Sequence, residues 1–551
     1  MKKSILASSI AAAVFGLGVT GAQAALVASS TGMGDVVIVP YYTAQADNAT
    51  LLTITNTDAT NGKAVKVRFR GAANSDDVFD FQVFLSPADV WAAMVSKDVA
   101  TGKAKLTTSD VSCTKPTSVN ATFSTVRLDP SLTGDAAANG TREGYIEIIS
   151  MADIPKTNTT YNVIQTSSTD TTNPLYTTIK HSKGVAPCTS AAFTALDSAT
   201  GSATTGVLDR LTNSAAVLNA TNTAANTATA ITAAAYGLTP STGGLMANWS
   251  IINTVSQAAW SGEAYAFGDD SVRGVAGAGT LVNYFPQTAT ALSAAEAEAY
   301  TADPLFLKGS LVRSYNKTTQ DLNAVDLATV RASTTPARYD LPDASTPMDS
   351  TTPTAYAIAL QTALGKASVI AEFATETDIN GSTDWQFSMP TRRYAVAMAY
   401  NKITATDDGR RFNALYQSTS ASTAVFNAFN TTVNTSNIIC VTGTSPKAYD
   451  REENTATSGV VISPQVLGQV SFCGEASILS WNNGQVSSAI KGNITVYPID
   501  VAPFKSGWAK MATQVYDTTG TPVLRNLPFV GGAFMKATNG VQGYGVYQYY
   551  R

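Results

Sequence analysis

Catalysis by a serine nucleophile usually requires a histidine as the base, and the 551-residue sequence holds one histidine, His181. This residue lies in the segment TIKHS at 178–182, without the Gly-x-Ser-x-Gly turn that presents the nucleophile in α/β-hydrolases. The pattern favours a histidine at the surface end of a strand. The sequence therefore predicts no catalytic triad.

Two other enzyme signatures are incomplete. Gly274, Gly277 and Gly279 match part of a dinucleotide-binding fingerprint, but the final glycine is missing, and the helix and ribose-binding carboxylate do not follow. These glycines predict a surface loop. Paired carboxylates for glycoside hydrolysis cannot be located by sequence, because their separation in space decides the chemistry. Solvated acids on loops are the favoured interpretation, and we predict that the chain is not an enzyme.

Oxygen-bearing side chains at alternate positions make calcium the metal that the sequence favours. Asp378, Asn380, Ser382 and Asp384 alternate along the segment DINGSTD, and Ca²⁺ binds carboxylate, amide and backbone oxygens. The match to an EF-hand loop is partial, since Met389 stands where a bidentate glutamate is needed. Asp and Asn are also common in turns that bind no metal. The four residues are a candidate calcium site.

The four cysteines predict two disulfides. Three pairings are possible, and we favour the local one, in which Cys113 pairs with Cys188 and Cys440 pairs with Cys473. Each bond would then staple one region and leave the middle of the chain free. A Cys/His zinc site is disfavoured, because the sequence has no Cys-x-x-Cys motif and a single histidine.

The candidate calcium segment lies between two stretches of β-forming residues. The stretches at 368–373 and 383–387 alternate apolar and polar residues, and the turn-forming segment 378–381 separates them. This pattern predicts a hairpin. The pair Asn61-Gly62 predicts a second hairpin, between strands at 51–55 and 64–69.

Alternation also assigns faces to the strand at 64–70. Val65, Val67 and Phe69 would face the core. The cations between them, Lys66 and Arg68, would face solvent together with Arg70. After a further strand at 78–85, the segment SPAD at 86–89 predicts a short helix that carries Trp91 and Met94.

The fold class is mainly β, with antiparallel β-sandwich-like regions, short helices and a broken-helical insertion rich in Ala, Thr and Asn at 190–245. Helices are expected at 291–300 and 355–364. We divide the chain into a signal peptide (1–24), an N-terminal β region (25–189), the insertion (190–245), a central β region (246–332), a Pro/Thr-rich linker and helix (333–366) and a C-terminal β region (367–551).

The N-terminus has the three parts of a secretory signal peptide. Lys2 and Lys3 precede an apolar run at 5–19, and Ala22-Gln23-Ala24 form a cleavage site. Removal of two lysines from 36 Lys and Arg, against 40 Asp and Glu, leaves a net charge of −6. The absence of a basic run disfavours nucleic acid as a partner. We therefore expect an exported protein.

Several motifs resemble those of secreted bacterial proteins described as cell-surface or surface-layer-like proteins. The resemblance spans nearly the whole mature chain except the insertion. It is carried by VPYY at 39–42 with LTITNT at 52–57, FLSPADVW at 84–91, TDW at 383–385, PTRR at 390–393 and PFVGG at 528–532. It implies a structural role at the cell surface and no catalytic residue.

Low charge density agrees with that role. Charged residues make up 14% of the chain, against about 25% in ordinary soluble domains. Few like charges then oppose contact between copies. We expect a structural protein that assembles with itself into a surface layer, together with an outer-membrane surface component as anchor. An outer-membrane β-barrel and a secreted hydrolase are the alternatives.

Overall fold

A computed structural model describes residues 26–157, 171–197, 236–269, 282–284, 287, 312–318, 321–325, 343–346, 353–400, 402, 404–413, 425–451, 465–467, 469–482, 488–516, 523–539 and 542–551. The fold is mainly β, with 50% strand and 10% helix, which confirms the predicted class. The signal peptide and the helix predicted at 291–300 lie outside the described residues. Within these ranges no helix has the length and apolarity needed to span a bilayer.

Two antiparallel sheets form an N-terminal unit. The seven-stranded sheet has the order β1-β12-β2-β9-β4-β5-β8, and the five-stranded sheet has the order β11-β10-β3-β6-β7. Their strands are β1 (Leu26–Ala28), β2 (Val36–Thr43), β3 (Asn48–Asn56), β4 (Gly62–Gly71), β5 (Asp77–Leu85), β6 (Val90–Lys97), β7 (Ala104–Thr107), β8 (Cys113–Lys115), β9 (Glu143–Ile154), β10 (Leu245–Asn253), β11 (Ala259–Glu263) and β12 (Tyr265–Asp269).

Two larger sheets form a C-terminal unit. The four-stranded sheet has the order β16-β27-β22-β23 and the five-stranded sheet the order β26-β25-β17-β30-β31. Their strands are β16 (Ser368–Ala374), β17 (Ser382–Ser388), β22 (Lys447–Asp450), β23 (Gln465–Val466), β25 (Ala476–Asn482), β26 (Val496–Asp500), β27 (Ser506–Ala512), β30 (Val530–Asn539) and β31 (Gln542–Tyr549).

Three further sheets complete this unit, in the orders β14-β13-β19-β18, β15-β29-β28 and β20-β21-β24. Their strands are β13 (Val312–Asn316), β14 (Asp321–Val325), β15 (Gly365–Lys366), β18 (Val396–Met398), β19 (Asp407–Asn413), β20 (Thr431–Val433), β21 (Ile439–Thr442), β24 (Ser471–Cys473), β28 (Gln514–Tyr516) and β29 (Leu524–Pro528).

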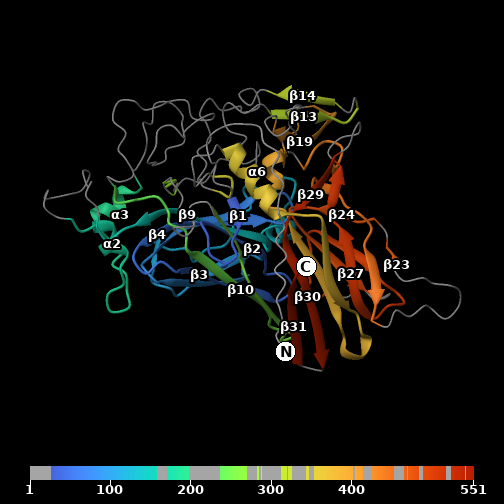
Figure 1. The fold of residues 1–551 in the computed structure, drawn as a ribbon, viewed down its shortest axis with the longest axis horizontal. Coiled ribbons are helices and arrows are strands. Elements are labelled where there is room, and N and C mark those ends of the chain that lie inside the picture. Colours follow the sequence, from blue (N-terminus) through green and yellow to red (C-terminus); the bar gives the residue numbers. More distant parts are fainter. Residues whose placement is uncertain are drawn as a thin grey trace, which may run out of the picture.

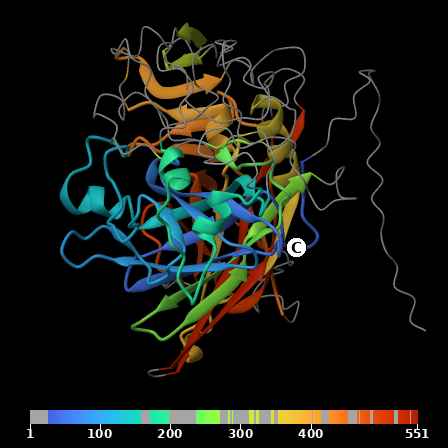
Figure 2. The same ribbon diagram turned by 90° about the vertical axis from the view of Figure 1, so that its left-hand side faces the viewer.

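The two units pack side by side, with the N-terminal strands on the left and the C-terminal strands on the right of Figure 1. Phe534 of β30 contacts Trp249 and Trp260 of the N-terminal unit, with ring centroids 5.8 and 6.1 Å apart. Figure 2 shows the green strands β10 and β11 beside the red C-terminal strands. The units therefore share apolar contacts along this boundary.

Strand β17 belongs to both sides of this boundary. Trp385 and Phe387 point into the C-terminal core. On the opposite face, Gln386 Nε2 and Ser388 Oγ donate hydrogen bonds to the carbonyl oxygen of Pro40, at 3.2 and 2.6 Å. Because successive side chains of a strand point to opposite faces, this strand carries an apolar face for one unit and a polar face for the other.

Neither predicted hairpin forms. β16 pairs with β27, whereas β17 pairs with β25 and β30 of the other sheet. Likewise β3 and β4 lie in different sheets of the N-terminal unit. The turn residues are where the sequence placed them, with Asn380 left-handed at φ 46°. Each turn carries the chain from one sheet to another, so the flanking strands meet through side chains.

The helix predicted after Ser86 is also wrong. Val90–Lys97 is strand β6, which pairs with β3 and β7. Asp89 accepts a hydrogen bond from the backbone N–H of Ser86 at 3.0 Å, so it stabilises a tight turn. Trp91 is fully buried and Met94 lies on the outer face. The alternation of buried and exposed residues in β6 has the period of a strand.

The described helices are short. The helix predicted at 355–364 is confirmed as α6 (Pro353–Leu364). The others are α1 (Gly134–Asn139), α2 (Pro174–Ile179), α3 (Ala191–Ala195), α7 (Arg392–Ala395) and the 3-10 helix η5 (Thr377–Ile379). In α3, at the edge of the predicted insertion, Phe193 packs on Phe84 at 4.8 Å. Residues 198–235 of the insertion lie outside the described residues.

The predicted central β region is divided between the two units. β10 pairs with β3 and with β11, and β12 pairs with β2 and β1, so these three strands complete the N-terminal sheets. β13 pairs instead with β19 of the C-terminal unit. The chain thus returns to its first sheets after a long excursion, which gives the N-terminal unit many contacts between residues far apart in sequence.

Both predicted disulfides are present. Cys113 is bonded to Cys188, and Cys440 is bonded to Cys473, with Cα–Cα distances of 5.2 and 3.8 Å. The first joins β8 to the segment between α2 and α3. The second joins the paired strands β21 and β24. Each bond closes a loop within its own unit, and two disulfides fit an oxidising, extracellular environment.

The burial of Trp385 predicts a large loss of stability on truncation. Its ring contacts Trp481 at 4.5 Å and Tyr550 at 5.7 Å, and its Nε1 donates to the carbonyl of Glu372 at 3.1 Å. Trp385→Ala should lower the free energy of unfolding by about 3–5 kcal/mol, measured by urea denaturation. Val99→Ala, at a residue 97% exposed, is the control. An unchanged midpoint for Trp385→Ala would contradict this packing.

Candidate functional site: a buried ion-pair cluster

The cations of β4 are buried, so the solvent-facing side predicted for this strand is wrong. Lys66, Arg68 and Arg70 each have 0% exposure. They point away from the apolar core that contains Val65, Val67 and Phe69. A buried charge is costly unless it is paired and hydrogen-bonded, so the partners of this row define the site.

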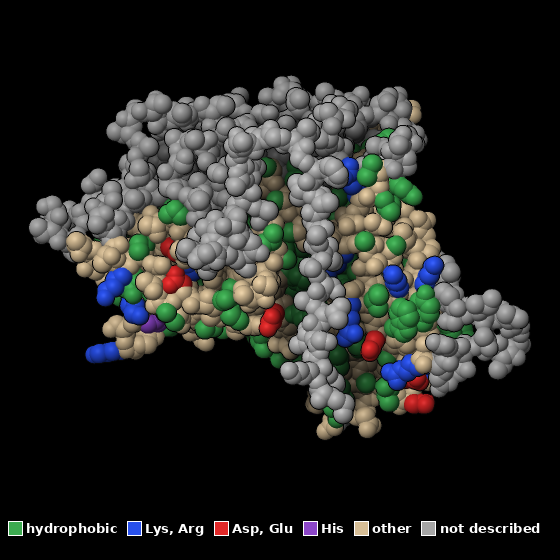
Figure 3. Space-filling model, in the orientation of Figure 1, with side chains coloured by type: hydrophobic (Ala, Val, Ile, Leu, Met, Phe, Trp, Pro, Cys, Tyr) green, Lys and Arg blue, Asp and Glu red, His purple; other side chains and the backbone are tan. Residues whose placement is uncertain are grey.

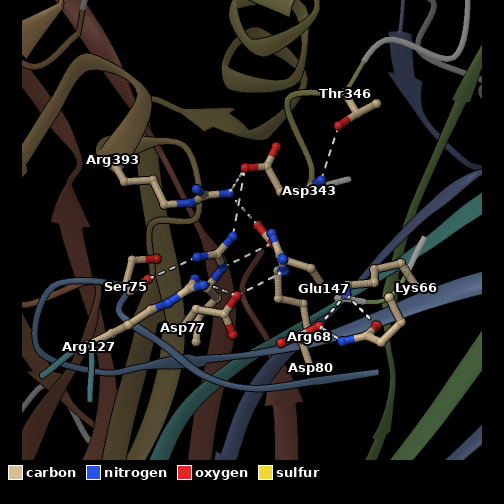
Figure 4. Close-up of polar contacts among 12 residues, drawn as sticks. Lys66, Arg68, Ser75, Asp77, Asp80, Arg127, Glu147, Asp343, Thr346 and Arg393 are labelled. Atoms are coloured by element: carbon tan, nitrogen blue, oxygen red, sulfur yellow. Dashed lines mark hydrogen bonds and ion pairs between the residues drawn. The ribbon is translucent and has the colours of Figure 1, made fainter. Parts of the chain in front are cut away.

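Each cation of β4 faces an acid on a neighbouring strand (Figure 4). Lys66 contacts Asp80 of β5. Arg68 Nε lies 3.1 Å from Asp77 Oδ2, to which Arg127 also contributes a nitrogen at 3.2 Å. The register brings these pairs within reach diagonally, because Asp80 is opposite Arg68 and Asp77 is opposite Arg70, so each acid pairs with the cation two residues earlier along β4.

Arg70 begins the central part of the cluster. Its Nε donates to Glu147 Oε2 at 3.2 Å, and its Nη2 lies 3.7 Å from Asp343 Oδ2. Asp343 precedes a turn that its own carboxylate stabilises, because Oδ1 accepts from Ser345 N at 2.9 Å. This hydrogen bond fixes the carboxylate of Asp343 in the position where it pairs with the guanidinium groups.

Arg393 of α7 connects the two units. Its Nη2 donates to Glu147 Oε1 at 3.2 Å and to Asp343 Oδ2 at 2.9 Å. Figure 4 shows Arg393 reaching both Asp343 and Glu147, which come from different segments. The neighbouring Arg392 donates from Nε to Glu475 Oε2 and from Nη1 to the carbonyl of Ile439, both at 2.5 Å. The PTRR segment thus supplies two buried arginines to the cluster.

The electrostatics favour ionised pairs at the centre of the cluster. Burial raises the pKa of Asp343, but the guanidinium groups of Arg393 and Arg70 outweigh that effect and lower its pKa overall. An acid held ionised in this way is a poor proton donor near neutral pH. The arrangement is suited to fixing strands β4 and β9, the 343–346 turn and α7 in one geometry.

A second polar junction lies beside the cluster. Asp76 Oδ2 accepts a hydrogen bond from Tyr400 Oη at 2.6 Å. Asn74 donates to the carbonyl of Asn437 at 2.9 Å, and Asn437 Nδ2 donates to Asp129 Oδ2 at 2.7 Å. These bonds link residues separated by more than 300 positions. Burial raises the pKa of Asp76 to about 7, despite the hydrogen bond from Tyr400.

The candidate calcium residues fall into two environments. Asp378 and Asn380 are exposed, whereas Ser382 and Asp384 are buried in β17. Asp384 Oδ2 accepts hydrogen bonds from Ser488 Oγ at 2.5 Å and from the N–H of Ile490 at 2.9 Å. The described residues contain no group of three or more His, Cys, Asp and Glu placed to hold a metal. Calcium binding by Asp378, Asn380, Ser382 and Asp384 stays a prediction.

His181 lies near a serine and an aspartate without the geometry of a triad. Its Nδ1 is 3.3 Å from Ser86 Oγ and 3.5 Å from Asp89 Oδ2. A triad needs the serine on one ring nitrogen and the acid on the other. Here both approach the same nitrogen, and Ser86 Oγ also donates to Asp89 at 3.2 Å. Ser86 and Asp89 therefore form a polar turn that contacts His181.

Loss of the bridging arginine should be costly. Arg393→Met removes one cation that pairs with both Glu147 and Asp343, and leaves those buried acids with less compensation. The free energy of unfolding should fall by about 3–5 kcal/mol, as measured by urea denaturation. The matched control is Arg451→Met at an exposed arginine, where a change within about 0.5 kcal/mol is expected. Equal effects of the two substitutions would contradict the bridging role.

Asp76 should make stability depend on pH. Its folded pKa of about 7 lies above the ordinary value of 3.8, so the folded state holds a proton that the unfolded state releases. Its contribution is fully present below pH 4 and is lost as pH rises through 7. Asp76→Asn should therefore match the wild type at pH 4 and exceed it at pH 8, by on the order of a few kcal/mol.

This comparison requires urea denaturation of both proteins at pH 4, 6 and 8. Asp378→Asn, at an exposed carboxylate of η5, is the control and should leave the pH profile unchanged. A difference between the Asp76→Asn variant and the wild type that stays constant across this range would show that Asp76 does not hold a proton in the folded state.

No family model matches the chain, and comparison with curated proteins and with solved structures also found no match. The functional argument therefore rests on this chain's own residues. These show cations, acids and aromatic residues far apart in sequence that together fix one rigid arrangement of sheets.

Proposed function

We propose that the chain is an exported structural protein of the bacterial cell surface that assembles with copies of itself. The observation that carries this proposal is strand β31, the terminal strand at one edge of the five-stranded sheet. Edge strands expose unpaired N–H and C=O groups that pair readily with another chain. The resemblance to surface-layer-like proteins and the low charge density support the same role.

The exposed side chains of β31 are suited to contact with a second copy. Tyr544 and Val546 are 62% and 55% exposed. The strand QGYGVYQY contains no charged residue and no proline, which are the usual means of blocking an edge. By contrast, β26 at the other edge of the same sheet carries Pro498, which cannot donate a hydrogen bond. Only one of the two edges is blocked in this way.

The other face of β31 is tied to the N-terminal unit. Tyr549 Oη donates to the carbonyl of Glu263 at 2.9 Å, and Trp260 Nε1 donates to the carbonyl of Met535 on β30 at 2.7 Å. Gly543 and Gly545 allow the backbone of residues 256–259 to approach, because a Cβ at either position would clash with it. Strand β31 is therefore held in a fixed position against the N-terminal unit.

A second apolar surface lies elsewhere on the C-terminal unit. Tyr516 of β28 is opposite Leu524 of β29, and both are exposed. Phe429 is also exposed, and the adjacent Asn430 donates to the carbonyl of Tyr516 at 3.0 Å. In Figure 1, β29 lies well above β31, which is near the bottom. Two separate contact surfaces allow growth beyond a closed dimer.

A charge on the edge strand β31 should prevent assembly. Val546→Lys places a lysine on β31, which opposes strand pairing with a second copy. Wild-type protein should form ordered sheets visible by electron microscopy, while the variant stays small by light scattering. Val99→Lys, which adds the same charge at a residue 97% exposed in a turn, is the matched control and should assemble. Monomeric wild-type protein across salts, pH values and divalent ions would refute the proposal.

A further inference from the structure

The outer face of the four-stranded sheet β16-β27-β22-β23 carries an unusual set of side chains. Along β27, Ala509 and Met511 are buried, whereas Trp508 and Lys510 are exposed. In β22, Lys447 is exposed and Tyr449 is partly exposed. Figure 3 shows hydrophobic side chains gathered over β27 with Lys and Arg side chains beside them. We name Trp508, Tyr449, Lys510 and Lys447 the basic-aromatic face.

The two aromatic residues form one stack. Tyr449 is directly opposite Trp508 in the register, and their rings lie 4.0 Å apart at an interplanar angle of 6°. Trp508 remains 38% exposed. On its other side Trp508 is opposite Glu372 of β16. Such a cross-strand pair stabilises a sheet, but sheet stability alone does not account for the residues in the next row.

The next row places two lysines opposite each other. Lys447 of β22 is opposite Lys510 of β27, two residues along each strand from the aromatic pair. Neither lysine has an ion-pair partner among the residues that the structure describes. Like charges directly opposite each other destabilise a sheet. An unfavourable contact that no other residue offsets marks a candidate functional position. A bound anion would offset the repulsion between these two lysines.

We propose that the basic-aromatic face binds an acidic polysaccharide built of uronic acids. The two ammonium groups would bind the carboxylates, while the apolar C–H face of a sugar ring packs against the exposed part of Trp508. The combination favours a ligand that carries anions and ring faces together, because the aromatic stack and the lysine pair occupy adjacent rows of one sheet.

Charge complementarity selects this occupant over a second copy of the chain. The mature chain is acidic overall, with 40 Asp and Glu residues, but its own C-terminal edge strand β31 contains no carboxylate to meet the lysines. Single-stranded nucleic acid also combines rings with anions. The disulfides fit an oxidising, extracellular environment, so we choose an acidic glycan outside the cell as the occupant and make the oligonucleotide an outcome of the test. This site does not depend on self-assembly.

The test is binding of the mature full-length protein to polygalacturonate by isothermal titration calorimetry, at low salt. We expect saturable binding that weakens as salt rises, because counterions compete with the carboxylates. The double variant Lys447→Gln/Lys510→Gln should weaken binding at least tenfold. Trp508→Leu should weaken binding with little change in the salt dependence. Lys97→Gln/Lys317→Gln, which removes the same charge at two other exposed lysines, should leave binding unchanged.

Binding to three further polymers distinguishes the contribution of the carboxylates from that of the sugar rings. Dextran, which has sugar rings and no charge, and polyglutamate, which has carboxylates and no rings, should both bind at least tenfold more weakly than polygalacturonate. A single-stranded oligodeoxynucleotide should also bind more weakly. The proposal is overturned if polygalacturonate does not bind, if any of these polymers binds equally well, or if the control variant loses affinity to the same extent.

Two readouts keep the result independent of folding and of assembly. The thermal midpoint of Lys447→Gln/Lys510→Gln should equal or exceed that of the wild type, since a like-charge pair is removed; a lower midpoint would contradict the account of this pair. Val546→Lys should bind polygalacturonate as the wild type does. Loss of binding in that variant would overturn a site confined to the basic-aromatic face, whatever the outcome for assembly.

Discussion

The bridge from Arg393 to Glu147 and Asp343 is the interaction on which the arrangement of the two units depends. It joins α7 of the C-terminal unit to β9 of the N-terminal unit, and it shares its acids with Arg70 of β4. Removing ions from water is expensive, and their attraction offsets that cost only when the geometry is good. A displaced partner would leave a buried charge uncompensated, so the cluster accepts few alternative arrangements.

The apolar contacts around the cluster are less selective. Phe534 packs between tryptophans of the other unit, and such contacts tolerate small shifts because dispersion is not directional. Hydrogen bonds of fixed direction add the missing specificity. Glu143, for example, accepts the hydroxyl of Tyr41 at 2.5 Å and the N–H of Asn493 at 3.1 Å. Apolar burial thus holds the units together, and polar bonds select the register in which they meet.

Sequence patterns located many strands and turns but could not assign strands to sheets. The segment DINGSTD and the Asn61-Gly62 pair are turns, yet β16 and β17, like β3 and β4, lie in different sheets. A turn reverses the chain whether the strands then bond edge to edge or face each other across a core. The choice depends on partners such as β27 and β30, more than 100 residues away, which local patterns do not contain.

Sequence patterns did not reveal the buried ion-pair cluster, for a related reason. The alternation in β4 correctly placed Val65 and Val67 on one face of the strand and the cations on the other. The charged side chains were expected to face solvent, whereas Lys66 and Arg68 are buried. The acids that reverse this conclusion come from β5, β9 and the 343–346 turn. A usable signal was present, because β9 carries the acids Glu143, Glu147 and Asp153 among apolar residues. Acids and cations on separate apolar strands indicate mutual burial. The disulfide pairing was predictable because each pair is local.

Burial of charge leaves the low charge content of the surface unchanged. Of the 36 Lys and Arg and 40 Asp and Glu residues, 21 are buried in the described part of the chain. Charged residues are thus about as frequent among the buried residues as in the whole sequence, so the described surface keeps a low charge density, and repulsion between copies would be weak. Against this background, two exposed lysines placed opposite each other stand out. The proposed self-assembly and the proposed glycan site would therefore use different surfaces, an uncharged edge strand β31 for one and the basic-aromatic face of β22 and β27 for the other.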